Sequence, residues 1–219
     1  MRFPAVAFDL DGTLYPNYRL NVRLVPFILK EQRLLRAFGK ARTILRKSGR
    51  GVVGDFYEEQ AKIVGEILGE NAEKVKDKIE KLIYRGWEDH FKKVRLFPHV
   101  TETLDALRKN GITLGLLSDF PPETKLKNLG IFDCWDMIVC SEQIGYLKPD
   151  TASLLEMAKR MGAAPEQILY VGNSVSYDVA GAHKAGMKAA LVNAMPFLHK
   201  RKADFVFSDY RQLRDYVLG

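Results

Sequence analysis

Cysteine is scarce in this chain of 219 residues, which contains only Cys134 and Cys140. With no Cys/His cluster beside them, a disulfide framework and a zinc site are not expected, and reduced thiols in the cytoplasm fit best. Long apolar runs are missing too, and no segment approaches the roughly 18 apolar residues of a membrane-spanning helix. The N-terminal residues 1–4 lead straight into a strand-like segment, which leaves no room for a signal peptide. We therefore expect a soluble cytoplasmic protein with no membrane partner.

Acidic residues are nearly absent from residues 19–50, where Glu31 stands alone among ten Lys and Arg residues. This segment carries a net charge of +9, against +7 for the whole chain. Such a charge can attract nucleic acid, acidic lipid or an anionic substrate, or it can form a solvated helix face. Because no nucleic-acid motif accompanies it, we do not expect a nucleic-acid partner. Arg46, Lys47 and Arg50 lie beside a glycine-broken loop and are candidate substrate contacts.

Short apolar runs alternate with helical patterns over most of the chain. The β-runs are residues 5–10, 112–117, 136–140, 168–171, 188–192 and 204–207. Helical periodicity lies between the later runs, for example over 101–110, 151–161 and 178–185, each followed by a glycine suited to a C-terminal cap. Strands that alternate with helices predict right-handed βαβ units. The expected fold class is therefore α/β, with a Rossmann-like parallel sheet covered by helices on both faces.

The stretch from residue 15 to 95 differs, because it holds no convincing β-run. Its apolar residues recur at helical spacing, and Gly49, Gly51 and Gly54 interrupt the pattern once. We interpret it as an inserted helical domain. The predicted division is a sheet domain of residues 1–14 and 96–219 and a helical insertion of residues 15–95, while the oligomeric state stays open.

Polar side chains follow three of the predicted strands. Asp9 and Asp11 follow the first, and they share one face if that strand continues. Ser118 and Asp119 follow the second predicted strand, and Asn173 follows the strand that ends at Val171. Ligands bind beyond the carboxyl ends of parallel strands, so these side chains are expected at one edge of the sheet.

Four motifs in this order resemble those of the haloacid dehalogenase (HAD) superfamily, most of whose members are phosphatases. The motifs are Phe8-Asp9-Leu10-Asp11-Gly12-Thr13-Leu14, Leu116-Leu117-Ser118-Asp119, Lys148-Pro149-Asp150, and the segment 169–178 with Asn173 and Asp178. The resemblance implies that Asp9 is a nucleophile that forms an aspartyl-phosphate, and that Asp11 is the general acid and base. It also implies that the insertion is a helical cap between the first two motifs.

Charge is the main chemical problem at such a site. A phosphate dianion that faces two carboxylates is repelled by roughly 1 kcal/mol per charge pair in water, and by several times more when partly buried. Mg²⁺ accepts hard oxygen ligands and bridges to phosphate, so it is the expected cofactor. The expected metal ligands are Asp9, the backbone carbonyl of Asp11, Asp178 and Asn173. The candidate phosphate-binding residues are Ser118, Asp119 and Lys148, and Ser118 and Lys148 are also counted as catalytic.

Two residues depart from the family pattern. Asp119 stands where an Asn is frequent and cannot donate a hydrogen bond when ionised, so it points away or pairs with Lys148 or another base. Asn173 stands where many phosphatases have an Asp. We therefore expect an Mg²⁺-dependent phosphatase acting on a small phosphorylated metabolite. A 2-haloacid dehalogenase, a phosphomutase and a phosphate-sensing or partner-binding protein with weak catalysis remain alternatives.

Overall fold

The computed structural model describes residues 2–17, 25–49, 51–52, 54–86, 91–193, 195 and 202–219. Its centre is a six-stranded sheet in the order β3-β2-β1-β4-β5-β6, and every neighbouring pair is parallel. The strands are β1 (Ala5–Phe8), β2 (Thr113–Ser118), β3 (Met137–Cys140), β4 (Ile168–Gly172), β5 (Lys188–Val192) and β6 (Phe205–Phe207). This confirms the expected α/β fold with a parallel Rossmann-like sheet.

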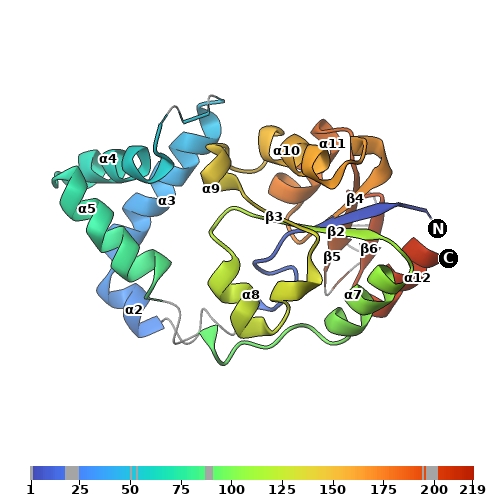
Figure 1. Ribbon diagram of the computed structural model, residues 1–219. Coiled ribbons are helices and arrows are strands. Elements are labelled where there is room, and N and C mark those ends of the chain that lie inside the picture. Colours follow the sequence, from blue (N-terminus) through green and yellow to red (C-terminus); the bar gives the residue numbers. More distant parts are fainter. Residues whose placement is uncertain are drawn as a thin grey trace.

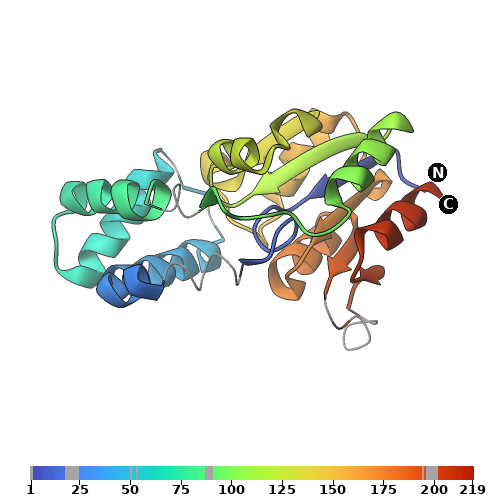
Figure 2. The ribbon, with the colours of Figure 1, turned by 90° about the horizontal axis from the view of Figure 1, so that it is seen from below.

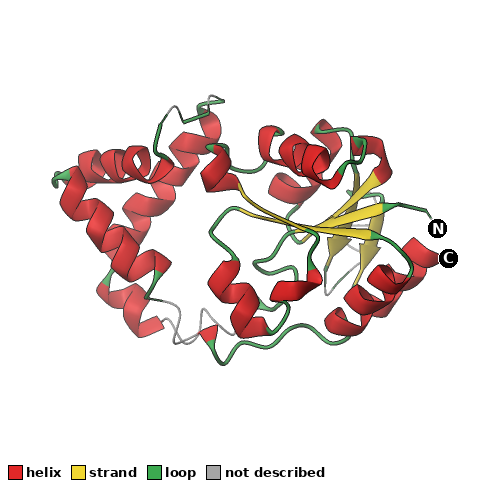
Figure 3. Ribbon diagram, in the orientation of Figure 1, coloured by secondary structure: helices red, strands yellow, loops and turns green. Residues whose placement is uncertain are grey.

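Helices cover both faces of this sheet (Figures 1 and 3). One face carries α10 (Ala152–Met161) and α11 (Ala180–Lys184), preceded by the π-helical turn η4 (Val175–Val179). The other face carries α7 (Val100–Lys109), α8 (Glu123–Leu129) and α12 (Tyr210–Leu218). Short elements complete the sheet region, namely η2 (Phe132–Cys134), α9 (Ser141–Ile144) and η3 (Pro165–Gln167). Strands buried on both faces explain why the β-runs are apolar throughout rather than alternating.

The insertion between β1 and α7 is helical in its described parts and stands to one side of the sheet (Figures 1 and 2). It contains α2 (Val25–Lys30), α3 (Gln32–Lys47), α4 (Phe56–Leu68), α5 (Ala72–Ile79) and the π-helical turn η1 (Glu80–Tyr84). These helices have their own buried cluster, which includes Leu34, Phe38, Val64 and Ile79. We call residues 25–86 the cap. The exact domain boundaries at 14/15 and 95/96 stay predictions.

Two local expectations differ from the structure. The first strand ends at Phe8 rather than continuing to Leu10, because residues 10–14 form a turn in which Leu14 N–H donates to the Leu10 carbonyl. The helix expected from Asp178 begins three residues earlier, at Val175, because the Ser174 hydroxyl accepts from Tyr177 N–H and caps it.

Both cysteines are free, with Cys140 buried and Cys134 partly so. None of the helices in the described residues is long and apolar enough to cross a membrane.

Candidate active site

The candidate site lies beyond the carboxyl ends of β1, β2 and β4. β1 lies between the other two, with Phe8 in register with Leu116 of β2 and with Val171 of β4. Asp9 therefore leaves the sheet between Ser118 and Asn173. The chain adds β2 and β3 on one side of β1 and then crosses to add β4 on the other side. Open parallel sheets bind ligands at the point where the strand order reverses in this way.

Lys148 joins two carboxylates at this edge. Its Nζ lies 2.6 Å from Asp9 Oδ1 and 2.7 Å from Asp178 Oδ1, and it donates to Tyr170 Oη at 3.2 Å. All three charged side chains are at least 90% buried. Burial acts to lower the pKa of Lys148, but the carboxylates of Asp178 and Asp9 outweigh it and hold this pKa well above its usual range. The ammonium therefore stays charged.

Asp9 is held at both of its carboxylate oxygens. Its Oδ2 accepts from the Thr13 hydroxyl at 2.6 Å, while Oδ1 is held by Lys148. Burial raises the pKa of Asp9, Lys148 opposes this rise and the nearby Asp178 adds to it. Asp9 is thus fixed by two partners from different segments of the chain.

Asp178 organises the loop after β4. Its Oδ2 accepts from the backbone N–H groups of Asn173 and Ser174, at 3.1 and 2.9 Å. Gly172 permits this approach, because a Cβ there would lie only 2.3 Å from the Asp178 Cβ. Asp178 is thus both a loop-organising residue and a partner of Lys148.

Asp11 has partners of its own and does not share those of Asp9. The Tyr15 hydroxyl donates to its Oδ1, and Lys125 Nζ lies 2.6 Å from the same oxygen. Asp9 and Asp11 would share one face only if β1 continued through both residues. Because β1 ends at Phe8, the two side chains have different partners. Asp11 is partly exposed, whereas Asp9 is buried, so only Asp11 retains access to solvent.

Asp119 faces the cap rather than an open phosphate site. Its Oδ2 lies 2.7 Å from Arg46 Nη2 and 3.5 Å from Arg42 Nη2, and its Oδ1 accepts from Lys148 N–H at 3.2 Å. Burial acts to raise the pKa of Asp119, but Lys148, Arg42 and Arg46 outweigh it and hold the pKa below its ordinary value. Asp119 is therefore ionised. It pairs with other bases, one of the two arrangements expected from the sequence.

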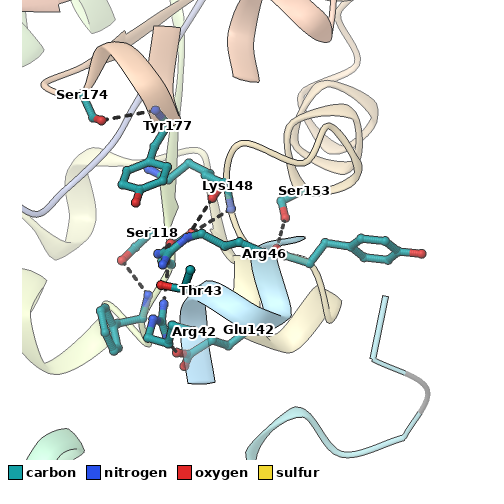
Figure 4. A network of polar contacts seen from close by, with 12 residues as sticks. Arg42, Thr43, Arg46, Ser118, Glu142, Lys148, Ser153, Ser174 and Tyr177 are labelled. Atoms are coloured by element: carbon teal, nitrogen blue, oxygen red, sulfur yellow. Dashed lines mark hydrogen bonds and ion pairs between the residues drawn. The ribbon is translucent and has the colours of Figure 1, made fainter. Parts of the chain in front are cut away.

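The remaining candidates are placed as follows. Ser118 is buried, and its Oγ accepts from Phe120 N–H at 3.2 Å. Arg46 also donates through Nε to the Lys148 carbonyl at 3.0 Å, which brings it to the site (Figure 4). Lys47 is exposed, and Arg50 lies outside the described residues.

Sequence reasoning missed a buried ion pair between the cap and the sheet region. Arg42 of α3 pairs with Glu142 of α9 (Figure 4). Glu142 also accepts from the Tyr84 hydroxyl at 3.0 Å. Both side chains of the pair are at most 5% exposed. The only signal in the sequence was the basic segment as a whole, which did not single out Arg42.

A backbone carbonyl and a side-chain amide meet where β1 and β4 end. Asn173 Nδ2 lies 3.3 Å from the Asp11 carbonyl oxygen, so the side-chain amide points toward this carbonyl. Rotation of the amide by half a turn places its oxygen where the nitrogen now lies. Gly12, at φ +86°, keeps this space open, since a Cβ there would meet Asn173 Nδ2 at 2.0 Å. These hard oxygens and Asp9 suit Mg²⁺. In the described residues, however, no three His, Cys, Asp or Glu side chains form a metal-binding group.

Comparison with known proteins agrees with this geometry. Residues 3–186 match the family model for haloacid dehalogenase-like hydrolases. A glyceraldehyde 3-phosphate phosphatase from Methanothermobacter thermautotrophicus is 30% identical over 205 residues, covering 87% of this chain and 85% of that protein. A phosphoglycolate phosphatase from Escherichia coli is 28% identical over 197 residues, covering 83% of this chain and 77% of that protein.

Solved structures share the fold. A HAD phosphatase from Thermococcus onnurineus superposes with a TM-score of 0.67 at 22% identity, covering 98% of each chain. A 2-haloacid dehalogenase from Pseudomonas syringae pv. tomato gives 0.68 at 23% identity, covering 97% of each chain. The family match over most of the chain, together with the carboxylates and lysine at the strand ends, shows that this protein belongs to the haloacid dehalogenase-like hydrolases.

Proposed function

We propose that the protein is an Mg²⁺-dependent phosphatase that hydrolyses a small phosphorylated metabolite through an aspartyl-phosphate on Asp9. The observation that carries the proposal is the placement of two separately held carboxylates at one strand end. Asp9 is buried and fixed by Lys148 and Thr13, and Asp11 is partly exposed and held by Lys125 and Tyr15. The relatives named as phosphatases support the reaction class. A cytoplasmic location is part of the same proposal.

Each residue has a separate role in the proposed reaction. Asp9 attacks phosphorus in line and the ester oxygen leaves, taking a proton from Asp11. Asp11 then removes a proton from the water that attacks the phosphorus of the aspartyl-phosphate, which returns Asp9 as a carboxylate. Lys148 orients Asp9 and offsets charge on the transferring group, and Ser118 contacts its oxygens. Asp9, the Asp11 carbonyl, Asp178 and Asn173 would hold Mg²⁺, which would supply further positive charge.

Asp11 separates this proposal from the dehalogenase alternative. A dehalogenase uses an aspartate nucleophile but needs no acid two residues later, whereas here Asp11 is held at the same strand end by Tyr15 and Lys125. A phosphomutase would use the same groups and differs in returning the phosphoryl group to a sugar. A phosphate-sensing protein would bind phosphate esters with little turnover.

A turnover screen tests these functions against one another. Phosphorylated sugars, nucleotides, phosphoglycolate and chloroacetate are each supplied with and without Mg²⁺. The proposal expects phosphate release that stops on chelation and no chloride release. Chloride release from chloroacetate that resists chelation would instead establish a dehalogenase. Isomerised sugar phosphate without net phosphate release would establish a mutase.

A further inference from the structure

A cavity of about 420 Å³ lies between the cap and helix α8. From the cap it is lined by Tyr57, Tyr84 and Arg85, and from the sheet region by Phe120, Lys125 and Asn128, among others. Its volume falls within the roughly 300–1,000 Å³ of pockets that bind drug-sized ligands. The site residues discussed so far do not account for this space, apart from Lys125.

Two residues of the inner cavity wall contact residues of the proposed reaction. Lys125, in the wall, lies 2.6 Å from Asp11 Oδ1. Phe120, also in the wall, donates its backbone N–H to Ser118 Oγ at 3.2 Å. A leaving oxygen that takes a proton from Asp11 must come within about 3 Å of that carboxyl group. The carbon skeleton attached to this oxygen would therefore extend along Lys125 into the cavity.

The walls have the chemistry to hold a flat ring. The ring centroids of Tyr57 and Tyr84 lie 5.5 Å apart, and those of Tyr84 and Phe120 lie 6.0 Å apart, so three aromatic side chains form a row of edge-to-face pairs along the wall. Aromatic pairs with ring centroids 4.5–7 Å apart gain about 0.5–1.5 kcal/mol beyond their buried area. Asn128 adds an amide that can both donate and accept a hydrogen bond.

Charge in the wall argues against an anionic leaving group. Lys125 is paired with Asp11, and Arg85 is paired with Glu80 at 2.7 Å. The lining residues in the described part of the chain therefore offer no cation without a carboxylate partner. Glu123, a further lining residue, adds negative charge. A carboxylate on the leaving group, as glycolate carries, would be repelled.

We propose, building on the phosphatase function above, that this cavity binds the leaving group and selects phosphate monoesters of uncharged, ring-bearing alcohols. A nucleoside 5′-monophosphate and 2-phenylethyl phosphate represent this class. Two- and three-carbon phosphates leave most of the cavity empty and gain nothing from its aromatic wall.

The test compares values of kcat/KM for adenosine 5′-monophosphate, 2-phenylethyl phosphate, glyceraldehyde 3-phosphate and phosphoglycolate in the presence of Mg²⁺. The variant Asn128→Trp fills the cavity from α8. Lys127→Trp is the matched control, because Lys127 is an exposed neighbour on the same helix and does not line the cavity. Binding of the two ring-bearing esters is also measured by calorimetry without Mg²⁺, which does not depend on turnover.

We expect the ring-bearing esters to exceed both small esters by about tenfold or more in kcat/KM, equivalent to about 1.4 kcal/mol. Asn128→Trp should remove this advantage and weaken ring-ester binding, with a smaller effect on the small esters, and Lys127→Trp should change neither. The proposal is overturned when phosphoglycolate is hydrolysed as well as the ring-bearing esters, or when Asn128→Trp slows all four esters alike.

Failure of the phosphatase function gives a different pattern. In that case no ester is hydrolysed, yet the ring-bearing esters still bind to the wild-type protein and to Lys127→Trp but not to Asn128→Trp. Absence of both turnover and ring-ester binding would contradict the two proposals together.

Discussion

Lys148 gives the candidate site its geometry, because one ammonium group holds two buried carboxylates that would otherwise repel each other. Two carboxylates and one lysine leave a net charge of −1, which a cation or the partial neutralisation of Asp9 must offset before a phosphate dianion can approach. The same arrangement fixes the orientation of Asp9. At the residue scale, the site is thus an ion-pair network of Lys148 with Asp9 and Asp178, to which our proposal adds a phosphate ester and Mg²⁺.

The variant Asp11→Asn tests the proton transfer. We expect kcat to fall by about 10²–10⁴-fold, because an amide neither protonates the leaving oxygen nor deprotonates water. Steady-state phosphate release measures kcat, and a thermal unfolding midpoint near that of the wild type shows that the fold survives. An unchanged kcat would remove Asp11 from the mechanism.

The residues around the proposed metal give a paired prediction. Asn173→Asp adds a charged oxygen ligand and should lower the Mg²⁺ concentration needed for half-maximal activity. Asp178→Ala should raise that concentration, since it frees two backbone N–H groups and one side of Lys148. Activity measured against Mg²⁺ concentration checks both variants. Activity that fully resists chelation in the wild type would contradict the metal assignment.

Helix α3 is the element that connects the cap to the site. Arg42 and Arg46, one helical turn apart, both reach across to the sheet region, where they pair with Glu142 and Asp119. Arg36, Lys40 and Lys47 of the same helix are exposed. The basic segment is therefore partly a solvated helix face and partly a set of contacts between the cap and the sheet region, and the sequence did not distinguish these roles.

The Arg42–Glu142 contact predicts a pH dependence of stability. Burial raises the pKa of Glu142 from an ordinary value of 4.5 to about 7, although Arg42 opposes the rise. The folded state thus keeps the proton over a wider pH range than the unfolded state. This contribution to stability is fully present below about pH 4.5 and is lost as the pH rises through about 7.

Glu142→Gln isolates this effect. Between pH 4.5 and about 7, titration of Glu142 should lower the free energy of unfolding of the wild type by at most about 3 kcal/mol. Because Gln does not titrate, this decrease should be missing in the variant. Urea unfolding of both proteins at the two ends of the range measures the difference. Parallel pH profiles for the two proteins would show that Glu142 is ionised throughout.

For the whole molecule, Arg46 brings positive charge of the cap to the candidate site, where we propose that phosphate esters bind. Arg46→Gln together with Lys47→Gln should raise KM and weaken its dependence on salt, because fewer cations attract the anionic substrate. Lys40→Gln, an exposed position on the same helix, serves as the control for general surface charge. If KM and its salt dependence match those of the wild type, the outer part of this face is only solvated.

The sheet and the strand-end residues were predictable, because apolar runs that end in polar residues are local signals. Contacts that depend on how the cap packs were not. Arg42 and Glu142 are separated by 100 positions, and Asp11 and Lys125 by 114, so no local pattern relates them. The sequence also did not show that Asp9 and Asp11 have different partners, because this depends on β1 ending two residues earlier than its apolar run suggests.

The variant Asp9→Asn tests the central claim most directly. An amide oxygen is a poor nucleophile, and the change is nearly isosteric, so we expect turnover to be abolished while the thermal unfolding transition persists. Asp133→Asn, at an exposed position outside the site, should keep wild-type activity. Near-wild-type phosphatase activity in Asp9→Asn would contradict the account, because Asp9 could not then be the residue that receives the phosphoryl group.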